Sequence, residues 1–329
     1  KNIKIINKYN SELKEKDLTL LGLVTNGGQG LATGNNGDFV GCIEGSNEAK
    51  RVFAQRPVKL FLVVKKYTKK LHKKFPELIK LDDLESVKDY LSKINEQKIR
   101  ELFFSIKQFL GRDVFGQGFL YRIISQDEVM KVDKMTSEEK SQGIKIKERI
   151  YVKYDKGDKE GNRWIFETPY LIKWNYESLN FLKTNSLARW QGYNFFFKNG
   201  FCWSDIHTTY LKCRLKNRTV NDVKSMSLTS INPNISDKYL VCIINSSFIS
   251  NFQQNFLNNT ASFQINDARR LPIVVPTKKI SKQFINIFDS AEKVKNNFLN
   301  KKISFDEQIV RLSNIENEND LLVEKIYDF

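Results

Sequence analysis

The spacing of apolar residues changes along this chain, and that change constrains its fold more than any other feature. Between residues 46 and 110, and again after residue 276, apolar side chains recur at the three- and four-residue intervals of helices. Elsewhere, short apolar and aromatic runs are broken by Gly, Asn and Asp, which is typical of strands and loops. We therefore predict an α+β fold, with a mixed, partly barrel-like sheet of short strands, a helical insertion at about 46–110 and a C-terminal helical pair.

The helical segments contain two more specific patterns. In the insertion, KLFLVV at 59–64 predicts a short strand. It is followed by lysines that recur every four residues and would form one basic stripe on a helix: Lys65, Lys69 and Lys73, and Lys66, Lys70 and Lys74. Near the C-terminus, Ser304 and Glu307 have the spacing of a capping box, which predicts the start of a final helix.

The charge of the chain indicates a polyanionic partner. There are 54 Lys and Arg residues against 38 Asp and Glu residues, a formal net charge of +16. Nucleic acid is the first candidate for a partner of such a chain. The alternative is a composition set by an AT-rich genome, because the sequence is also rich in Asn and Ile. Charge alone leaves both explanations open.

Several classes of protein are disfavoured by what the sequence lacks. No apolar run approaches the length of a membrane span, so no membrane partner is expected. The cysteines form no C-x-x-C pair and only two histidines are present, which argues against a zinc site and fits the reducing cytoplasm. We interpret His207 as an ordinary histidine that binds no metal. The cysteines and histidines of the chain are Cys42, Cys202, Cys213, Cys242, His72 and His207.

Catalytic motifs are also missing. An adenine methyltransferase needs a proline-rich loop, typically Asn-Pro-Pro-Tyr, for the flipped base and a Gly-rich turn for the methyl donor. The sequence contains no Pro-Pro, and GGQG at 27–30 lacks the acidic partner of a cofactor turn. We therefore predict that this chain is not itself an enzyme and has no catalytic, cofactor-binding or metal-binding residues.

Four segments, in this order along the chain, resemble elements of one family. They are GLATGNNGDFV at 30–40, YVKYDKG at 151–157, FKNGFCWSDI at 197–206 and NNTASFQINDARRLPIVV at 258–275. Together they resemble the C-terminal target-recognition, or specificity, region of type IIG restriction–modification enzymes and related adenine-specific DNA methyltransferases. The segment at 46–110 matches none of these elements and resembles an insertion.

The resemblance implies a domain organisation and a function. Residues 1–17 would connect to a catalytic domain outside this chain, 18–276 would form the DNA target-recognition domain, and 277–329 would form C-terminal helices. Such a region binds duplex DNA sequence-specifically, through the major groove, and presents the target adenine to the catalytic methyltransferase domain of the same polypeptide. The parent would act in bacterial defence, would use S-adenosylmethionine, and would need Mg²⁺ if it also cleaves DNA.

The candidate DNA contacts are basic, amide, hydroxyl and glycine residues in or near these segments. A Gly/Asn loop brings backbone N–H groups and amides to phosphates or base edges, and basic residues on an aromatic strand can hold phosphates. Phe263 and Gln264 are expected to anchor the domain, with Trp203 in the core. The candidates are Thr33, Gly34, Asn35, Asn36, Lys66, Lys70, Lys156, Gly157, Arg163, Arg189, Ser204, Arg269 and Arg270.

Structural explanations compete with each of these assignments. The loop at 33–36 could be a turn between strands, 156–163 a solvated hairpin tip, Ser204 or Asp205 a helix cap, and the lysine stripe a solvated helix face. Other functions also stay open. A half of a type I specificity subunit would use similar domains, a catalytically competent methyltransferase or nuclease would show activity, and a protein–protein interaction module would bind without sensitivity to salt.

Overall fold

The computed structural model describes residues 13–116, 118–145, 148–157, 162–206 and 210–328. His207 and most of the predicted connector at 1–17 lie outside them. The chain divides into two compact units, and both contain helices and strands. Unit 1 consists of residues 1–32, 155–168 and 190–329, and unit 2 of residues 33–154 and 169–189. The predicted α+β class is confirmed, and the strands of the described residues do not close into a barrel.

Unit 2 contains a small mixed sheet with the strand order β4-β3-β6-β5. Strand β3 (Val40–Ile43) pairs in parallel with β4 (Arg122–Ile124) and antiparallel with β6 (Tyr170–Lys173). Strand β6 in turn pairs antiparallel with β5 (Tyr151–Asp155). Short helices complete this part: α2 (Asn36–Phe39), η3 (Gln126–Glu128), η4 (Val132–Lys134), α6 (Ser137–Gln142) and α7 (Tyr176–Thr184).

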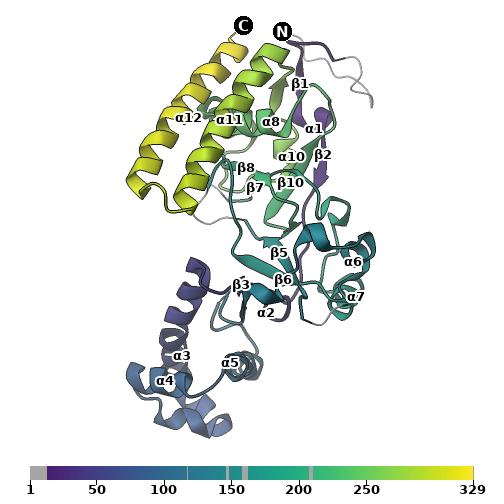
Figure 1. Cartoon of the computed structure of the whole chain (residues 1–329). Coiled ribbons are helices and arrows are strands. Elements are labelled where there is room, and N and C mark those ends of the chain that lie inside the picture. The colour runs from purple at the N-terminus through teal and green to yellow at the C-terminus, as the bar shows by residue number, and fades with distance from the viewer. Residues whose placement is uncertain (1–12, 117, 146–147, 158–161, 207–209, 329) are drawn as a thin grey trace. The chain divides into compact units, whose positions relative to one another are not determined.

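The predicted insertion at 46–110 is helical and belongs to unit 2 (Figure 1). It consists of α3 (Asn47–Lys74), η2 (Pro76–Lys80), α4 (Leu84–Ser92) and α5 (Glu96–Leu110). Gly111 ends α5 in the left-handed conformation, with φ of 68°. The strand predicted at 59–64 is wrong, because these residues lie in α3. Leu60, Val63 and Val64 are buried while Leu62 is exposed, so the run has one buried helical face.

Unit 1 is built on an antiparallel sheet with the strand order β2-β10-β7-β8. Its strands are β2 (Thr25–Gly28), β7 (Gly200–Ser204), β8 (Cys213–Lys216) and β10 (Ser225–Ser230). A separate antiparallel pair joins β1 (Leu18–Leu20) to β11 (Pro272–Val274), and β9 (Val220–Asn221) is a short further strand. The apolar run at 18–24 is divided between two elements, because α1 (Leu21–Val24) follows β1 directly.

Helices surround the core of unit 1. Between β10 and β11 lie α8 (Asp237–Ile244), α9 (Ser247–Phe252), the π-helical turn η6 (Gln253–Leu257) and α10 (Ile265–Ala268), and η5 (Tyr193–Phe195) precedes β7. The C-terminal pair is confirmed: α11 (Lys278–Leu299) and α12 (Phe305–Tyr327) lie side by side (Figure 1). Ser304 caps α12 by accepting a 3.1 Å hydrogen bond from the Glu307 N–H.

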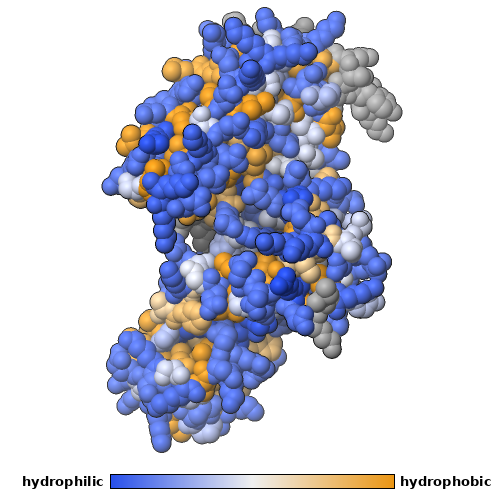
Figure 2. Space-filling view, viewed as in Figure 1, coloured by the Kyte–Doolittle hydropathy of each residue, from blue (hydrophilic) through white to orange (hydrophobic). Residues whose placement is uncertain are grey.

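The two C-terminal helices differ in how they are covered. Phe284, Phe288 and Ala291 of α11 are buried in the same core cluster as α8. On α12, Phe305, Val310 and other apolar side chains are exposed, and Figure 2 shows orange residues among blue ones over this pair. Within the described residues, no helix is long and apolar enough to cross a membrane.

Candidate nucleic-acid interface

Two of the segments that carry the family resemblance pack against each other in unit 1. Trp203, at the end of β7, donates a 3.0 Å hydrogen bond from Nε1 to the carbonyl of Phe263, and the two rings lie 6.0 Å apart. The Phe263 N–H donates to the carbonyl of Asp205 at 2.8 Å. Both aromatic side chains are buried, as the sequence predicted for a core Trp and an anchoring Phe. The segments 197–206 and 258–275 therefore form one structural element.

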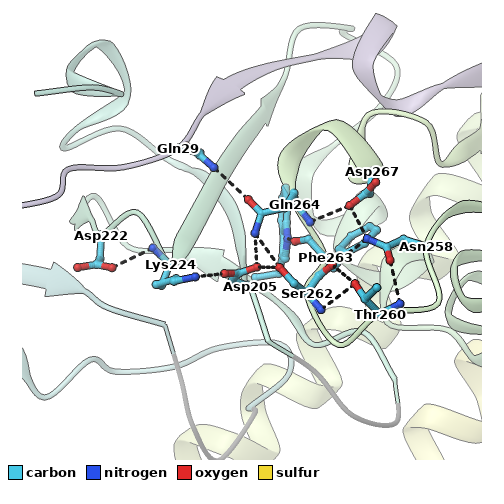
Figure 3. A network of polar contacts seen from close by, with 11 residues as sticks. Gln29, Asp205, Asp222, Lys224, Asn258, Thr260, Ser262, Phe263, Gln264 and Asp267 are labelled. Atoms are coloured by element: carbon cyan, nitrogen blue, oxygen red, sulfur yellow. Dashed lines mark hydrogen bonds and ion pairs between the residues drawn. The ribbon is translucent and has the colours of Figure 1, made fainter. Parts of the chain in front are cut away.

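A buried carboxylate, Asp205, organises the polar groups at this junction (Figure 3). Its Oδ1 accepts hydrogen bonds from Ser262 Oγ, at 2.5 Å, and from Gln264 Nε2. Its Oδ2 accepts from Lys224 Nζ, whose side chain is 58% exposed. The alternative of a helix cap is wrong for Asp205, because it caps none of the helices that the structure describes. Instead it orients an amide on one side and an exposed ammonium on the other.

Three glutamines extend this arrangement away from Asp205. Gln29, which follows β2, donates from Nε2 to Gln264 Oε1 at 3.0 Å. Gln191 donates from Nε2 to Gln29 Oε1 at 3.4 Å and to the Gly30 carbonyl at 3.0 Å. We call Gln191, Gln29, Gln264 and Asp205 the amide array. Each of its side chains is held by the next, so the amides are oriented before any ligand binds.

The array has unused hydrogen-bonding capacity at its centre. A glutamine amide has two N–H groups and two acceptor lone pairs. Contacts within the described residues use one N–H and one lone pair of Gln29, so one of each is left for a ligand. Gln29 is only half-buried. One donor beside one acceptor is the complement of the adenine edge in the major groove.

The loop that carries Gln191 is fixed against the array by close backbone packing. Gly192 has φ of +69°, and a Cβ at this position would lie 2.1 Å from the carbonyl oxygen of Gln29. Any larger residue would push the loop away. The neighbouring rings of Trp190 and Tyr193 stack with centroids 6.3 Å apart, and Tyr193 is 54% exposed. An exposed aromatic ring therefore stands beside the amides.

A buried ion pair in unit 1, between Arg214 and Asp155, lies next to three sequence-predicted candidates. They are Lys156, Gly157 and Ser204. Arg214 Nη2 donates to Asp155 Oδ1 at 2.7 Å, and both side chains are almost fully buried. Burial raises the pKa of Asp155, but the charge of Arg214 and hydrogen bonds from Gly157 and Ser225 outweigh it and hold the pKa below the ordinary value. The pair is ionised at neutral pH and fixes the backbone at Gly157.

The basic candidates of unit 1 are more engaged with acidic groups than the sequence suggested. Lys156 lies 3.1 Å from Asp222 and Arg163 lies 3.3 Å from Glu316, and both basic side chains are only 12% exposed. Arg163 also covers the ring of Tyr210, at 3.8 Å. These contacts favour a structural role for both residues, so neither is placed as an open phosphate clamp.

The other candidates of unit 1 lie nearer the amide array. A Cβ on Gly157, whose φ is +80°, would lie 3.4 Å from Ser204 Oγ, so these two residues are neighbours. Arg269 is exposed and donates from Nη2 to the Gly27 carbonyl at 3.1 Å, two residues before Gln29. Arg270 is exposed as well.

Unit 2 holds the remaining candidates in two places. Thr33 Oγ1 donates to Asn36 Oδ1 at 2.7 Å, and Asn35 donates to Asp38, so the amides of this loop brace the start of α2. Gly34 packs against the loop that leads to the exposed Arg189, because a Cβ on Gly34 would lie 2.5 Å from the Leu187 carbonyl oxygen. Lys66 and Lys70 lie apart from this loop, exposed on α3.

The sequence interpretation missed three residues of this interface. Gln29 and Gln191 each stand in a glycine-flanked loop, GGQG and WQGY, and that shared pattern is the signal that could have found them. Lys224 has no such signal, since its acidic partner Asp205 is distant in the sequence. No cluster of three or more His, Cys, Asp or Glu side chains suited to a metal ion occurs within the described ranges.

Comparison of the chain with known protein-family models and with curated proteins finds no match.

Proposed function

We propose that this chain is a sequence-specific DNA-binding region, the target-recognition part of an adenine-specific DNA methyltransferase of the restriction–modification type. The observation that carries the proposal is the amide array of unit 1. Segments that resemble the recognition region of such enzymes supply Asp205 and Gln264 to it, and these residues orient Gln29. Oriented amides beside exposed basic groups suit the reading of base edges next to a phosphate backbone.

In this proposal the amide side chains and the basic side chains contact different parts of the DNA. The half-buried Gln29 and Gln191 present amide groups, which distinguish bases by paired donors and acceptors. Arg269 and Arg270 are exposed near the same junction and supply positive charge for phosphates, whereas the exposed Lys224 is paired with Asp205. The chain would present the target adenine to a catalytic domain of the same polypeptide, which would bind S-adenosylmethionine. Its location would be the cytoplasm, where the DNA is.

Selection from a randomised duplex pool tests the proposal directly. We expect the wild-type chain to enrich a defined motif at low salt. We expect Gln29→Leu to keep the fold but to lose preference at one or two positions of that motif, because the replacement cannot pair with a base edge. The loss at those positions should be about 1–3 kcal/mol, or roughly five- to 150-fold in affinity.

The matched control is Gln283→Leu, an exposed glutamine on α11 outside the array. It should select the wild-type motif unchanged. Failure of the wild-type chain to enrich any sequence would contradict the proposal. A radiolabelled methyl-transfer assay separates the proposal from a competent methyltransferase, and we expect this chain alone to transfer no methyl group.

A further inference from the structure

The second half of α3 carries an unusual concentration of exposed lysines. We call Lys65, Lys66, Lys69, Lys70, Lys73 and Lys74 the lysine face. All six are exposed, and within the described residues none lies within ion-pair distance of an acidic side chain. Lys65 and Lys66 instead lie over the rings of Phe61 and Tyr67, each 5.7 Å from the ring centroid. The positive charge of this face is therefore not balanced locally.

Neighbouring helices of the same insertion show the opposite arrangement. On α4, Lys88 lies 2.6 Å from Glu85 and Lys93 lies 2.5 Å from Asp89. Earlier on α3 itself, Arg51 lies 2.5 Å from Glu48. A high lysine content therefore does not by itself explain the face, since other basic residues of the insertion have acidic partners one helical turn away.

The shape of α3 at the lysine face is fixed by side chains. Tyr67 departs from helical geometry, with φ of −116° and ψ of 24°, so the helix bends there. Thr68 Oγ1 donates to the carbonyls of Val64 and Lys65, each at 3.0 Å, a contact that bends helices. Arg112 covers the Tyr67 ring at 5.4 Å and donates to its hydroxyl, which adds another cation beside the bend.

Repulsion between the lysine charges destabilises this part of α3 when no anion is bound. Like charges three and four residues apart on a helix repel one another. The C-terminal end of a helix favours cations within its last turn, which covers Lys73 and Lys74 but not Lys65 to Lys70. Lysines four residues apart are about 6 Å apart along the axis of a helix, and two phosphate steps of one DNA strand cover roughly 7 Å along the axis of the duplex.

We propose that the lysine face binds the phosphates of duplex DNA without regard to base sequence. This inference rests on the proposed function and adds a second role to it. Unit 1 supplies the choice of sequence through the amide array, and α3 supplies affinity that depends on salt. Contacts to phosphates carry no sequence information, so the lysine face strengthens binding to selected and random duplexes equally.

The test is the salt dependence of binding by the full chain, measured by fluorescence anisotropy on the selected duplex and on a random duplex of the same length. Each lost phosphate contact reduces the slope of log K against log salt by about 0.9. We expect Lys66→Gln with Lys70→Gln to reduce the slope by about 2 and to weaken both complexes about ten-fold at roughly 0.1 M salt. The ratio of the affinity for the selected duplex to the affinity for the random duplex should not change.

The control is Lys88→Gln with Lys93→Gln, which removes two exposed but ion-paired lysines from the same insertion. It should match wild type in slope and affinity. Gln has nearly the helix propensity of Lys, so circular dichroism should show both double variants folded.

Each other outcome overturns the inference in a recognisable way. If wild type binds DNA and the Lys66/Lys70 variant behaves like the control, the lysine face fails and the proposed function stands. If the variant changes the ratio between the duplexes, these lysines read bases instead. If the variant loses binding only to vesicles of anionic phospholipid, the partner is a membrane. If wild type binds no duplex even at low salt, both proposals fail.

Discussion

Lys216 is the residue whose burial most conflicts with its charge. It ends β8 with its side chain almost fully buried and donates from Nζ to the carbonyl of Phe195. Burial lowers its pKa to about 8, although the neighbouring Cys202 and Asp155 act in the opposite direction. The contact ties β8 to the segment that follows Gln191 and Tyr193. A buried lysine therefore helps to hold the segment next to the amide array in place.

Lys216 should make stability rise with pH above neutrality. Between its pKa of about 8 in the folded chain and its ordinary value of 10.5, the folded state has released a proton that the unfolded state still holds. Raising the pH through this window therefore favours folding. Lys216→Met should remove this gain. Above pH 8, the free energy of unfolding of wild type should therefore rise relative to that of the variant by roughly 1 kcal/mol per pH unit.

Urea unfolding at pH 7, 8 and 9 measures this difference. Lys212→Met, a half-exposed lysine that lies over Tyr210, is the control and should follow the wild-type profile. Parallel profiles for Lys216→Met and wild type would show that the Lys216 ammonium is not buried as described.

Single residues also show what a sequence can and cannot reveal. The need for glycine at position 34 was predictable from the TGNN pattern, and its φ of +69° agrees. The acidic partners of Lys156 and Arg163 were not predictable, because Asp222 and Glu316 come together with them only through the fold. Both basic residues were therefore expected as phosphate clamps, whereas the structure places them in ion pairs.

Among the elements, the helices of the insertion show where periodicity succeeds and fails. The helices α4 and α5 have one apolar face each, and the pattern predicted them. The run KLFLVV is continuous in apolar residues, so its spacing cannot separate a strand from a buried helix. What decides the matter is packing: Leu60, Val63 and Leu71 face the same core cluster as Phe103 of α5. That partner is distant in sequence, and no local pattern identifies it.

Arg56 joins the elements of this insertion. It lies on α3, is fully buried, pairs with Glu96 of α5 at 2.6 Å and donates to the carbonyls of Phe119 and Tyr121. Arg56→Ala should destabilise the insertion by about 3 kcal/mol, because it leaves buried acceptors without a donor. Hydrogen exchange should therefore accelerate in α3 and α5 but not in α8 and α11 of unit 1.

The control for that measurement is Arg51→Ala, one turn earlier on the same helix. Its ion pair with Glu48 is partly exposed, so the change should cost no more than about 1 kcal/mol. If the two variants exchanged alike, or if unit 1 responded as strongly as the insertion, Arg56 would not be the local link that its contacts indicate.

For the whole molecule, the fold class was predictable and the division into units was not. Alternating helical and strand-like segments gave the α+β class and the C-terminal pair. Unit 2, however, is assembled from 33–154 and 169–189, while unit 1 takes the segment between them. The pattern of apolar residues along the sequence does not indicate which unit a given segment joins. The order of the resemblance segments is informative instead, since two of them meet at Asp205 and Phe263.

The charge of the whole molecule leads to the last prediction. The formal net charge is +16, and the lysine face supplies six positive groups without acidic partners in the described structure, while Arg269 and Arg270 are exposed in unit 1. If several of these groups displace counterions from DNA, affinity for a random duplex should fall ten-fold or more between about 50 and 200 mM salt. A module that binds only another protein predicts no such dependence. Anisotropy titrations in chloride and in glutamate measure it, and a dissociation constant that changes less than about two-fold would favour the protein-binding alternative.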